Sequence, residues 1–205
     1  MKLRTVLLIG LGLVPSLLMA TPMPYGGMSG MQAAERAARD NPAMVLRDGI
    51  NKLLAFMRSN SGNDEKAVAA FLEKEIAPYF DFTYMSRWIS GPAHRQMGPS
   101  QRKAMEAQLK AQFLGALAQR LAGYDNQKVQ FFRPHRGRGN EVKVSVGILR
   151  PGTYPSKIDF RFYRGRDGWK VFDVAANGSS ALVHYRQQFN RSQRKPRGRM
   201  WPARY

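Results

Sequence analysis

Few side chains in this sequence have the type and spacing that chemistry at an active site requires. The three histidines, His94, His135 and His184, are far apart and show none of the short spacings of a metal site. The absence of cysteine excludes disulfides, thiolate metal ligands and a cysteine nucleophile. No glycine-rich phosphate-binding motif and no nucleophile motif of the G-x-S-x-G type occurs. The sequence therefore predicts no cofactor, no metal and no catalytic residue.

One pair of carboxylates could still do acid–base chemistry. Asp159 and Asp173 lie on two segments that we expect to be neighbouring strands. We interpret them instead as partners of Arg161 or Lys170 in salt bridges. An active site built from Asp159 and His184 on a similar cone-shaped α+β scaffold is the alternative in which the protein is an enzyme.

The charge balance points to an anionic partner. The 205 residues include 33 Lys and Arg against 14 Asp and Glu, a net charge of +19. A hydrophobic fraction of 43% suits one packed domain rather than a disordered chain. Such a chain would attract nucleic acid, lipid headgroups or an acidic protein.

The first twenty residues are typical of a secretory signal peptide. Lys2 and Arg4 precede an apolar run that is too short to span a membrane, and the small residue Ala20 stands where signal peptidase would cut. We expect a mature protein in the periplasm of a Gram-negative cell, and its net charge falls to +17 because two basic residues are removed. Export argues against chromosomal DNA as the partner.

The mature chain divides into three parts. Residues 21–40, rich in Gly, Pro and Met, are expected to form a flexible lead-in. Residues 41–190 form a single domain. Residues 191–205 form a basic tail without acidic residues.

The predicted elements that must position any site change from helices to strands half-way along this domain. Capping residues and apolar spacings of three and four predict helices first. These are expected from Pro42 to about Met57, from Asp64 to about Tyr79, in a short segment from Phe80 to Gly91, and from Gln101 to about Gly123.

After Gly123 the apolar period becomes two, which indicates strands. We expect them around Val129–Phe131, Val142–Ile148, Ile158–Tyr163 and Trp169–Val174, followed by a short helix over Ser180–Phe189. Helices followed by an antiparallel meander predict an α+β fold, with an N-terminal helical layer packed on a C-terminal antiparallel β-sheet.

Two blocks of sequence carry a resemblance to a known family. Residues 80–124 contain Phe-Asp, Met-Ser-Arg and a Pro-x-Gln-Arg opening to a long helix that ends near a Tyr. Residues 144–189 contain a Pro-Gly turn, Gly-Trp-x-Val-x-Asp-Val and Arg-x-x-Phe. In order and spacing these blocks resemble the MlaC family of periplasmic phospholipid-binding proteins, over roughly residues 41–191.

The resemblance implies a monomeric carrier without cofactor or catalytic residues. Family members take a phospholipid between an inner-membrane ABC transporter complex and an outer-membrane lipoprotein complex, which maintains outer-membrane lipid asymmetry. They hold the acyl chains in a cavity between sheet and helices, with the headgroup near solvent. This implies Arg150 and Tyr154 as candidates at the headgroup mouth. The candidate lipid-binding residues are Ile50, Leu54, Met57, Leu109, Phe113, Leu117, Val144, Val146, Ile148, Ile158, Phe160 and Phe162.

This sequence departs from the family pattern at three places. Asn177 precedes Gly178 and Ser179 where relatives have an acidic residue. The basic tail is short, and the segment 133–139 is unusually basic. These departures bear on headgroup or partner preference rather than on the fold.

Three other functions compete with lipid carriage. A basic polyanion-binding or nucleic-acid-binding exported protein would use the positive charge and aromatic side chains such as Phe131 and Tyr163. An enzyme would use Asp159 with His184. A structural adaptor would have an interior that its own side chains fill.

Overall fold

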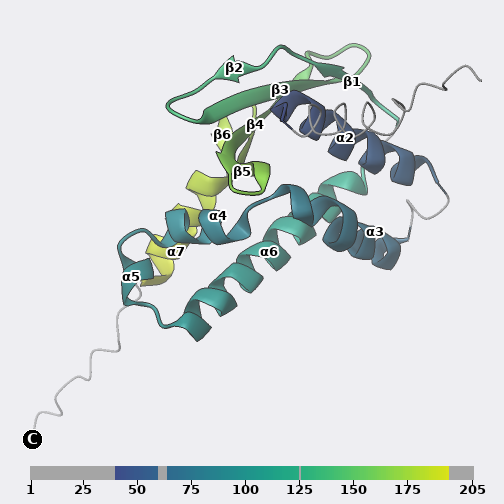
Figure 1. The fold of residues 1–205 in the computed structure, drawn as a ribbon. Helices are drawn as coiled ribbons and strands as arrows, with labels where there is room; N and C mark the ends of the chain where they lie inside the picture. Colours follow the sequence, from purple (N-terminus) through teal and green to yellow (C-terminus); the bar gives the residue numbers. More distant parts are fainter. Residues whose placement is uncertain (1–39, 60–63, 125, 194–205) are drawn as a thin grey trace, which may run out of the picture.

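The computed structural model describes residues 40–59, 64–124 and 126–193, in which helices pack beneath one antiparallel sheet (Figure 1). The predicted signal peptide, residues 1–20, lies outside the described residues. So do the lead-in except residue 40 and the tail beyond residue 193. No helix in the described ranges is both long and apolar enough to cross a bilayer.

The helices begin where the sequence supplies a cap. The Asn41 side chain accepts a hydrogen bond from the Ala43 amide at 3.0 Å, and Asp64 accepts one from the Lys66 amide at 2.9 Å. The α-helices are α2 (Pro42–Arg58), α3 (Glu65–Phe71), α4 (Phe82–Ser90), α5 (Ala93–Gln96), α6 (Pro99–Leu121) and α7 (Ala181–Gln193).

The helix predicted from Asp64 to Tyr79 is not uniform. After α3 the chain continues as a π-helical turn, η2 (Leu72–Ile76), and a 3-10 turn, η3 (Ala77–Tyr79). Pro78 has no amide hydrogen, so a regular α-helical ladder cannot run through it. The last helix also differs from the prediction, because it runs on to Gln193 rather than ending at Phe189.

The sheet confirms the predicted antiparallel meander. Its order is β1-β3-β4-β5-β6, and β2 also pairs with β3. Val144 lies opposite Phe160 and Val146 opposite Ile158, which places these four side chains on one face. The strands are β1 (Lys128–Phe131), β2 (His135–Arg136), β3 (Glu141–Leu149), β4 (Ser156–Gly165), β5 (Gly168–Ala176) and β6 (Ser179–Ser180).

A bulge in β5 sends one aromatic ring to the helices. Arg161 pairs with Asp173 and Phe162 with Val171, so Phe172 is the additional residue. Phe172 is 2% exposed and packs among helical side chains, whereas Val171 packs with the sheet. The bulge therefore couples the sheet to the helical layer.

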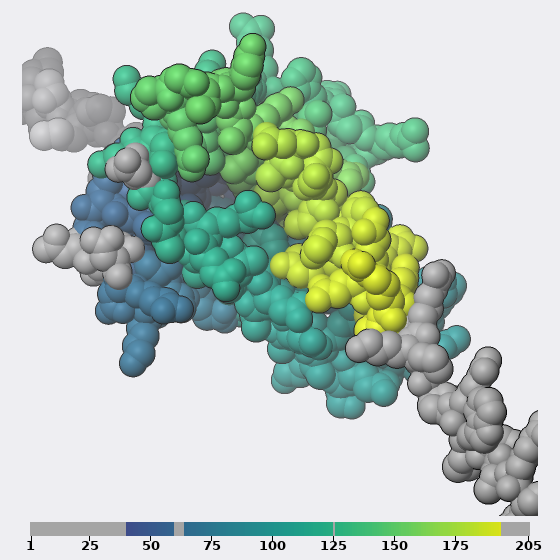
Figure 2. All heavy atoms as spheres, turned by 180° about the vertical axis from the view of Figure 1, so that it is seen from behind, coloured from purple at the N-terminus to yellow at the C-terminus, as the bar shows by residue number. Residues whose placement is uncertain are grey.

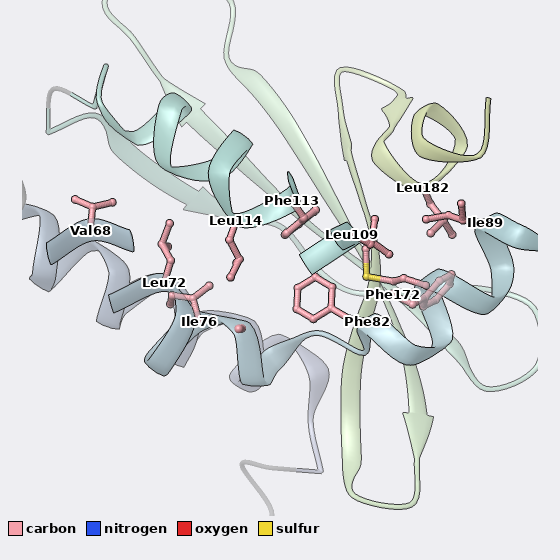
Figure 3. Close-up of a cluster of buried hydrophobic side chains, with 12 residues drawn as sticks. Val68, Leu72, Ile76, Phe82, Ile89, Leu109, Phe113, Leu114, Phe172 and Leu182 are labelled. Atoms are coloured by element: carbon pink, nitrogen blue, oxygen red, sulfur yellow. The ribbon is translucent and has the colours of Figure 1, made fainter. Parts of the chain in front are cut away.

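The buried apolar residues form two clusters. The sheet cluster joins α2 to the sheet face, and its members are Leu46, Val144, Val146, Phe162 and Val171. The helix cluster lies among α3, α4, α6 and α7 (Figure 3), and its members are Val68, Leu72, Ile76, Ala77, Phe82, Met85, Ile89, Leu109, Phe113, Leu114, Phe172 and Leu182. The α+β class with a helical layer on an antiparallel sheet is confirmed.

Candidate functional site

The twelve apolar residues predicted to bind lipid divide between the two clusters. The sheet cluster includes or contacts six of them: Ile50, Val144, Val146, Ile158, Phe160 and Phe162. The helix cluster includes or contacts four: Met57, Leu109, Phe113 and Leu117. Leu54 and Ile148 are half-buried and pack with neither cluster.

Burial separates these twelve residues into two kinds. An acyl chain can touch only side chains that the fold leaves partly open, because a fully buried side chain is already surrounded by protein atoms. Buried members, which stabilise the fold, are Leu109, Phe113, Val144, Val146 and Phe162. Half-buried members, which keep apolar surface available, are Ile50, Leu54, Met57, Leu117, Ile148, Ile158 and Phe160.

The two clusters meet at Phe80 and Val174, which pack against both. The ring centroids of Phe80 and Phe113 are 4.8 Å apart. The Asp81 amide donates a hydrogen bond to the Val171 carbonyl at 3.0 Å, which ties the chain before α4 to β5. These contacts close the interior at one place between sheet and helices.

Elsewhere the surface between sheet and helices is hollowed. Seen from behind, a recess lies between the green strands and the teal helix α6, and purple atoms of α2 lie deep within it (Figure 2). These are the three parts of the fold that supply the half-buried apolar residues.

The two residues predicted at the headgroup mouth lie in the loop between β3 and β4. Arg150 is exposed, and its carbonyl accepts a hydrogen bond from the Thr153 amide at 3.3 Å. Gly152 takes a positive φ of 74°, which glycine adopts without strain. Tyr154 is 98% exposed, so its aromatic ring is open to solvent. The loop follows directly on the strand end that carries Ile148.

The carboxylates considered for acid–base chemistry are bound to other groups. The Asp173 carboxylate lies 3.5 Å from the Arg161 guanidinium, which confirms the predicted ion pair. Asp159 instead accepts a hydrogen bond from the Ser145 hydroxyl and lies 3.6 Å from the Lys157 ammonium. The His184 ring packs edge-on against the Tyr185 ring, and the two ring centroids are 5.7 Å apart.

Sequence reasoning missed the structural role of Asp173. This side chain is 1% exposed and accepts hydrogen bonds from the Leu182 amide at 3.0 Å and from the Ser180 hydroxyl at 2.8 Å. It thereby holds the beginning of α7 against β5. The spacing of Asp173 before a helix start eight residues later gives no sequence signal of this contact.

A second missed contact joins Asp81 to Tyr163. The Asp81 carboxylate accepts hydrogen bonds from the Tyr84 amide at 2.7 Å and from the Tyr163 hydroxyl. Burial raises the pKa of Tyr163 above its ordinary value, and the hydrogen bond to Asp81 raises that pKa further. The Phe-Asp sequence gives no signal of this contact, because Tyr163 lies 82 residues further along the chain.

A third missed residue is Tyr124, between α6 and β1. Its hydroxyl is buried, and no described residue hydrogen-bonds to it. A buried hydroxyl without a partner costs free energy, so it is available to a water or to a ligand oxygen.

Comparisons with known proteins agree with this arrangement. The family model described as MlaC protein matches residues 47–197. A Haemophilus influenzae protein named intermembrane phospholipid transport system binding protein MlaC is 23% identical over 152 residues, 71% of each chain. The structure of a phospholipid-binding protein from Ralstonia solanacearum, solved in complex with a phospholipid, has a TM-score of 0.68. That match has 22% identity and covers 75% of this chain and 89% of the other, so it shows a shared fold.

Proposed function

We propose, because the chain belongs to the MlaC family, that it binds a phospholipid by its acyl chains and carries it through the periplasm. Its donors and acceptors would be an inner-membrane ABC transporter complex and an outer-membrane complex, and the transfer would maintain lipid asymmetry. The observation that supports the proposal is that α2, α6 and the sheet, the three parts around the recess of Figure 2, each carry half-buried apolar residues. The phospholipid-binding relatives support the same assignment.

The physical task of such a carrier is to replace water around the acyl chains. Two chains contain about 30 methylenes, and at about 0.8 kcal/mol for each the transfer free energy into water is on the order of 20 kcal/mol. Side chains such as Leu54, Ile148 and Phe160 offer apolar surface to accept them. The membrane is an equally apolar competitor, so the carrier's affinity for lipid need not be extreme.

The carrier needs no catalytic group, because it makes and breaks no covalent bond. The energy for directed transport would come from the ATPase of the inner-membrane complex. The headgroup would stay near solvent, where the Arg150 guanidinium could pair with a phosphate.

Lipid extraction tests the proposal. The mature protein is purified from its own cells without detergent, extracted with organic solvent and analysed by mass spectrometry. We expect about one phospholipid for each protein chain. Protein that emerges folded and free of lipid, and that takes up none from vesicles, would contradict the proposal.

A further inference from the structure

A pocket of about 470 Å³ lies at the hairpin between β2 and β3. It shares no residue with the twelve apolar residues discussed above. Lys143 and Arg161 alternate along their strands with Val144 and Phe160, so their side chains lie on the opposite face of the sheet. The pocket is lined by His135, Arg136, Gly137, Arg138, Glu141, Val142, Lys143 and Arg161.

Most of the positive charge in this pocket is not neutralised. Arg161 is paired, with the Glu141 carboxylate at 3.0 Å and the Asp173 carboxylate at 3.5 Å. Arg136, Arg138 and Lys143 take part in none of the salt bridges found in the described part of the chain. Three cations therefore face one cavity whose only lining carboxylate is already bound to a fourth cation.

The strand register gathers basic side chains in one row across three strands. Lys143 lies directly opposite Arg161 on β4 and directly opposite His135 on β2. Like charges at directly opposite positions destabilise an antiparallel pair. Two carboxylates already offset the charge of Arg161, so the charge of this row without a carboxylate partner is that of Lys143, and a bound anion would neutralise it.

We propose that this pocket binds a phosphate-class anion through Arg136, Arg138 and Lys143. Arginine presents a planar set of donors that matches two phosphate oxygens, and lysine adds a compact charge. The anion would be the headgroup phosphate of a membrane lipid or a free phosphate. The site is separate from the apolar recess, so the protein can bind this anion whether or not it carries acyl chains.

Two binding measurements on the mature chain distinguish the two sources. Calorimetry with inorganic phosphate, at constant ionic strength set by chloride, tests free phosphate. Sedimentation with vesicles of phosphatidylcholine and phosphatidylglycerol, compared with phosphatidylcholine alone, tests the headgroup. We expect binding in at least one measurement, and a loss of about tenfold or more in the R136Q/R138Q/K143Q variant because each charge-assisted hydrogen bond contributes strongly.

A variant with the same loss of charge elsewhere provides the control. Lys66, Arg95 and Lys103 are exposed on α3, α5 and α6, and none of them lines the pocket. The variant K66Q/R95Q/K103Q should therefore retain binding. Equal losses in both triple variants, or no binding by the wild-type protein in either measurement, would overturn the proposal. If K143Q prevents folding, R136Q/R138Q decides the question, since both arginines are exposed and the double variant should still bind more weakly.

Discussion

At the scale of single residues, partial exposure separates apolar side chains that keep open surface from those that the fold surrounds. Leu54 is half-buried on α2 and packs with neither cluster, so part of its apolar surface stays open. Met44, on the same helix, is 45% exposed. The two positions allow the proposed lipid-binding surface to be tested with the same substitution.

Leu54→Glu should reduce the phospholipid that copurifies with the protein severalfold, because an acyl chain beside a carboxylate would desolvate the charge. Met44→Glu should keep the wild-type amount. The measurement is lipid phosphorus for each mole of folded protein. Equal lipid content in both variants would exclude Leu54 from the binding surface.

Tyr163→Phe should lower the free energy of unfolding by about 1–2 kcal/mol near neutral pH, because it removes a hydrogen bond to a charged group at a half-buried site. The raised pKa of Tyr163 predicts how this difference depends on pH. Its contribution is complete below the unfolded pKa of about 10 and is lost as the pH rises from there toward the folded pKa. The stability difference between wild type and variant should therefore shrink in alkaline solution.

Chemical denaturation of both proteins at about pH 8 and about pH 11 measures this change. Tyr154→Phe is the control, because Tyr154 is 98% exposed and should give no difference at either pH. A Tyr163→Phe difference that stays constant across this range would show that the hydroxyl titrates alike in folded and unfolded chains.

Sequence patterns predicted the faces of these residues better than their exposure. Alternation placed Val144, Val146, Phe160 and Phe162 on one face of the sheet, as the structure has them. Alternation does not say which of them another element covers. Val144 and Phe162 are buried and Phe160 is half-buried because packing by α2 and β5 decides exposure.

At the scale of elements, α7 depends on one buried carboxylate. Asp173→Ala should destabilise the protein by about 1–3 kcal/mol, because the Leu182 amide and the Ser180 hydroxyl lose their acceptor. Amide hydrogen exchange should speed up first in α7, since its start is released from β5. Denaturation and exchange mass spectrometry measure the two effects.

Two variants sharpen this test. Asp173→Asn keeps one acceptor oxygen and should recover part of the lost stability. Asp167→Ala, in the exposed turn between β4 and β5, should change stability by no more than about 0.5 kcal/mol. Faster exchange spread evenly over all helices, rather than concentrated in α7, would contradict this role of Asp173.

The start of most helices could be predicted, but their partners could not. Asn41, Asp64 and Asp81 are capping residues, and the structure shows each side chain accepting backbone hydrogen bonds at a helix start. The π-helical turn at Leu72–Ile76 has no such signal, since its apolar spacing continues that of α3. The bulge that moves Phe172 to the helices is equally hidden, because it depends on pairing between β4 and β5.

At the scale of the whole molecule, the two clusters predict how the protein behaves without lipid. Each cluster buries its own residues, so delipidated protein should remain folded. It should unfold at a lower urea concentration, because a ligand that binds only the folded state stabilises it by about 2.7 kcal/mol at a hundredfold excess over Kd. Returning phospholipid from vesicles should restore the urea concentration at which half of the protein is unfolded. Identical unfolding midpoints with and without lipid would argue against a bound ligand.

The sheet cluster and the helix cluster meet at Phe80 and Val174, and this has a consequence for the proposed carrier. Because each cluster is packed by its own side chains, neither depends on a bound ligand to stay folded. A carrier of the proposed kind could therefore release its lipid and stay folded while it is empty.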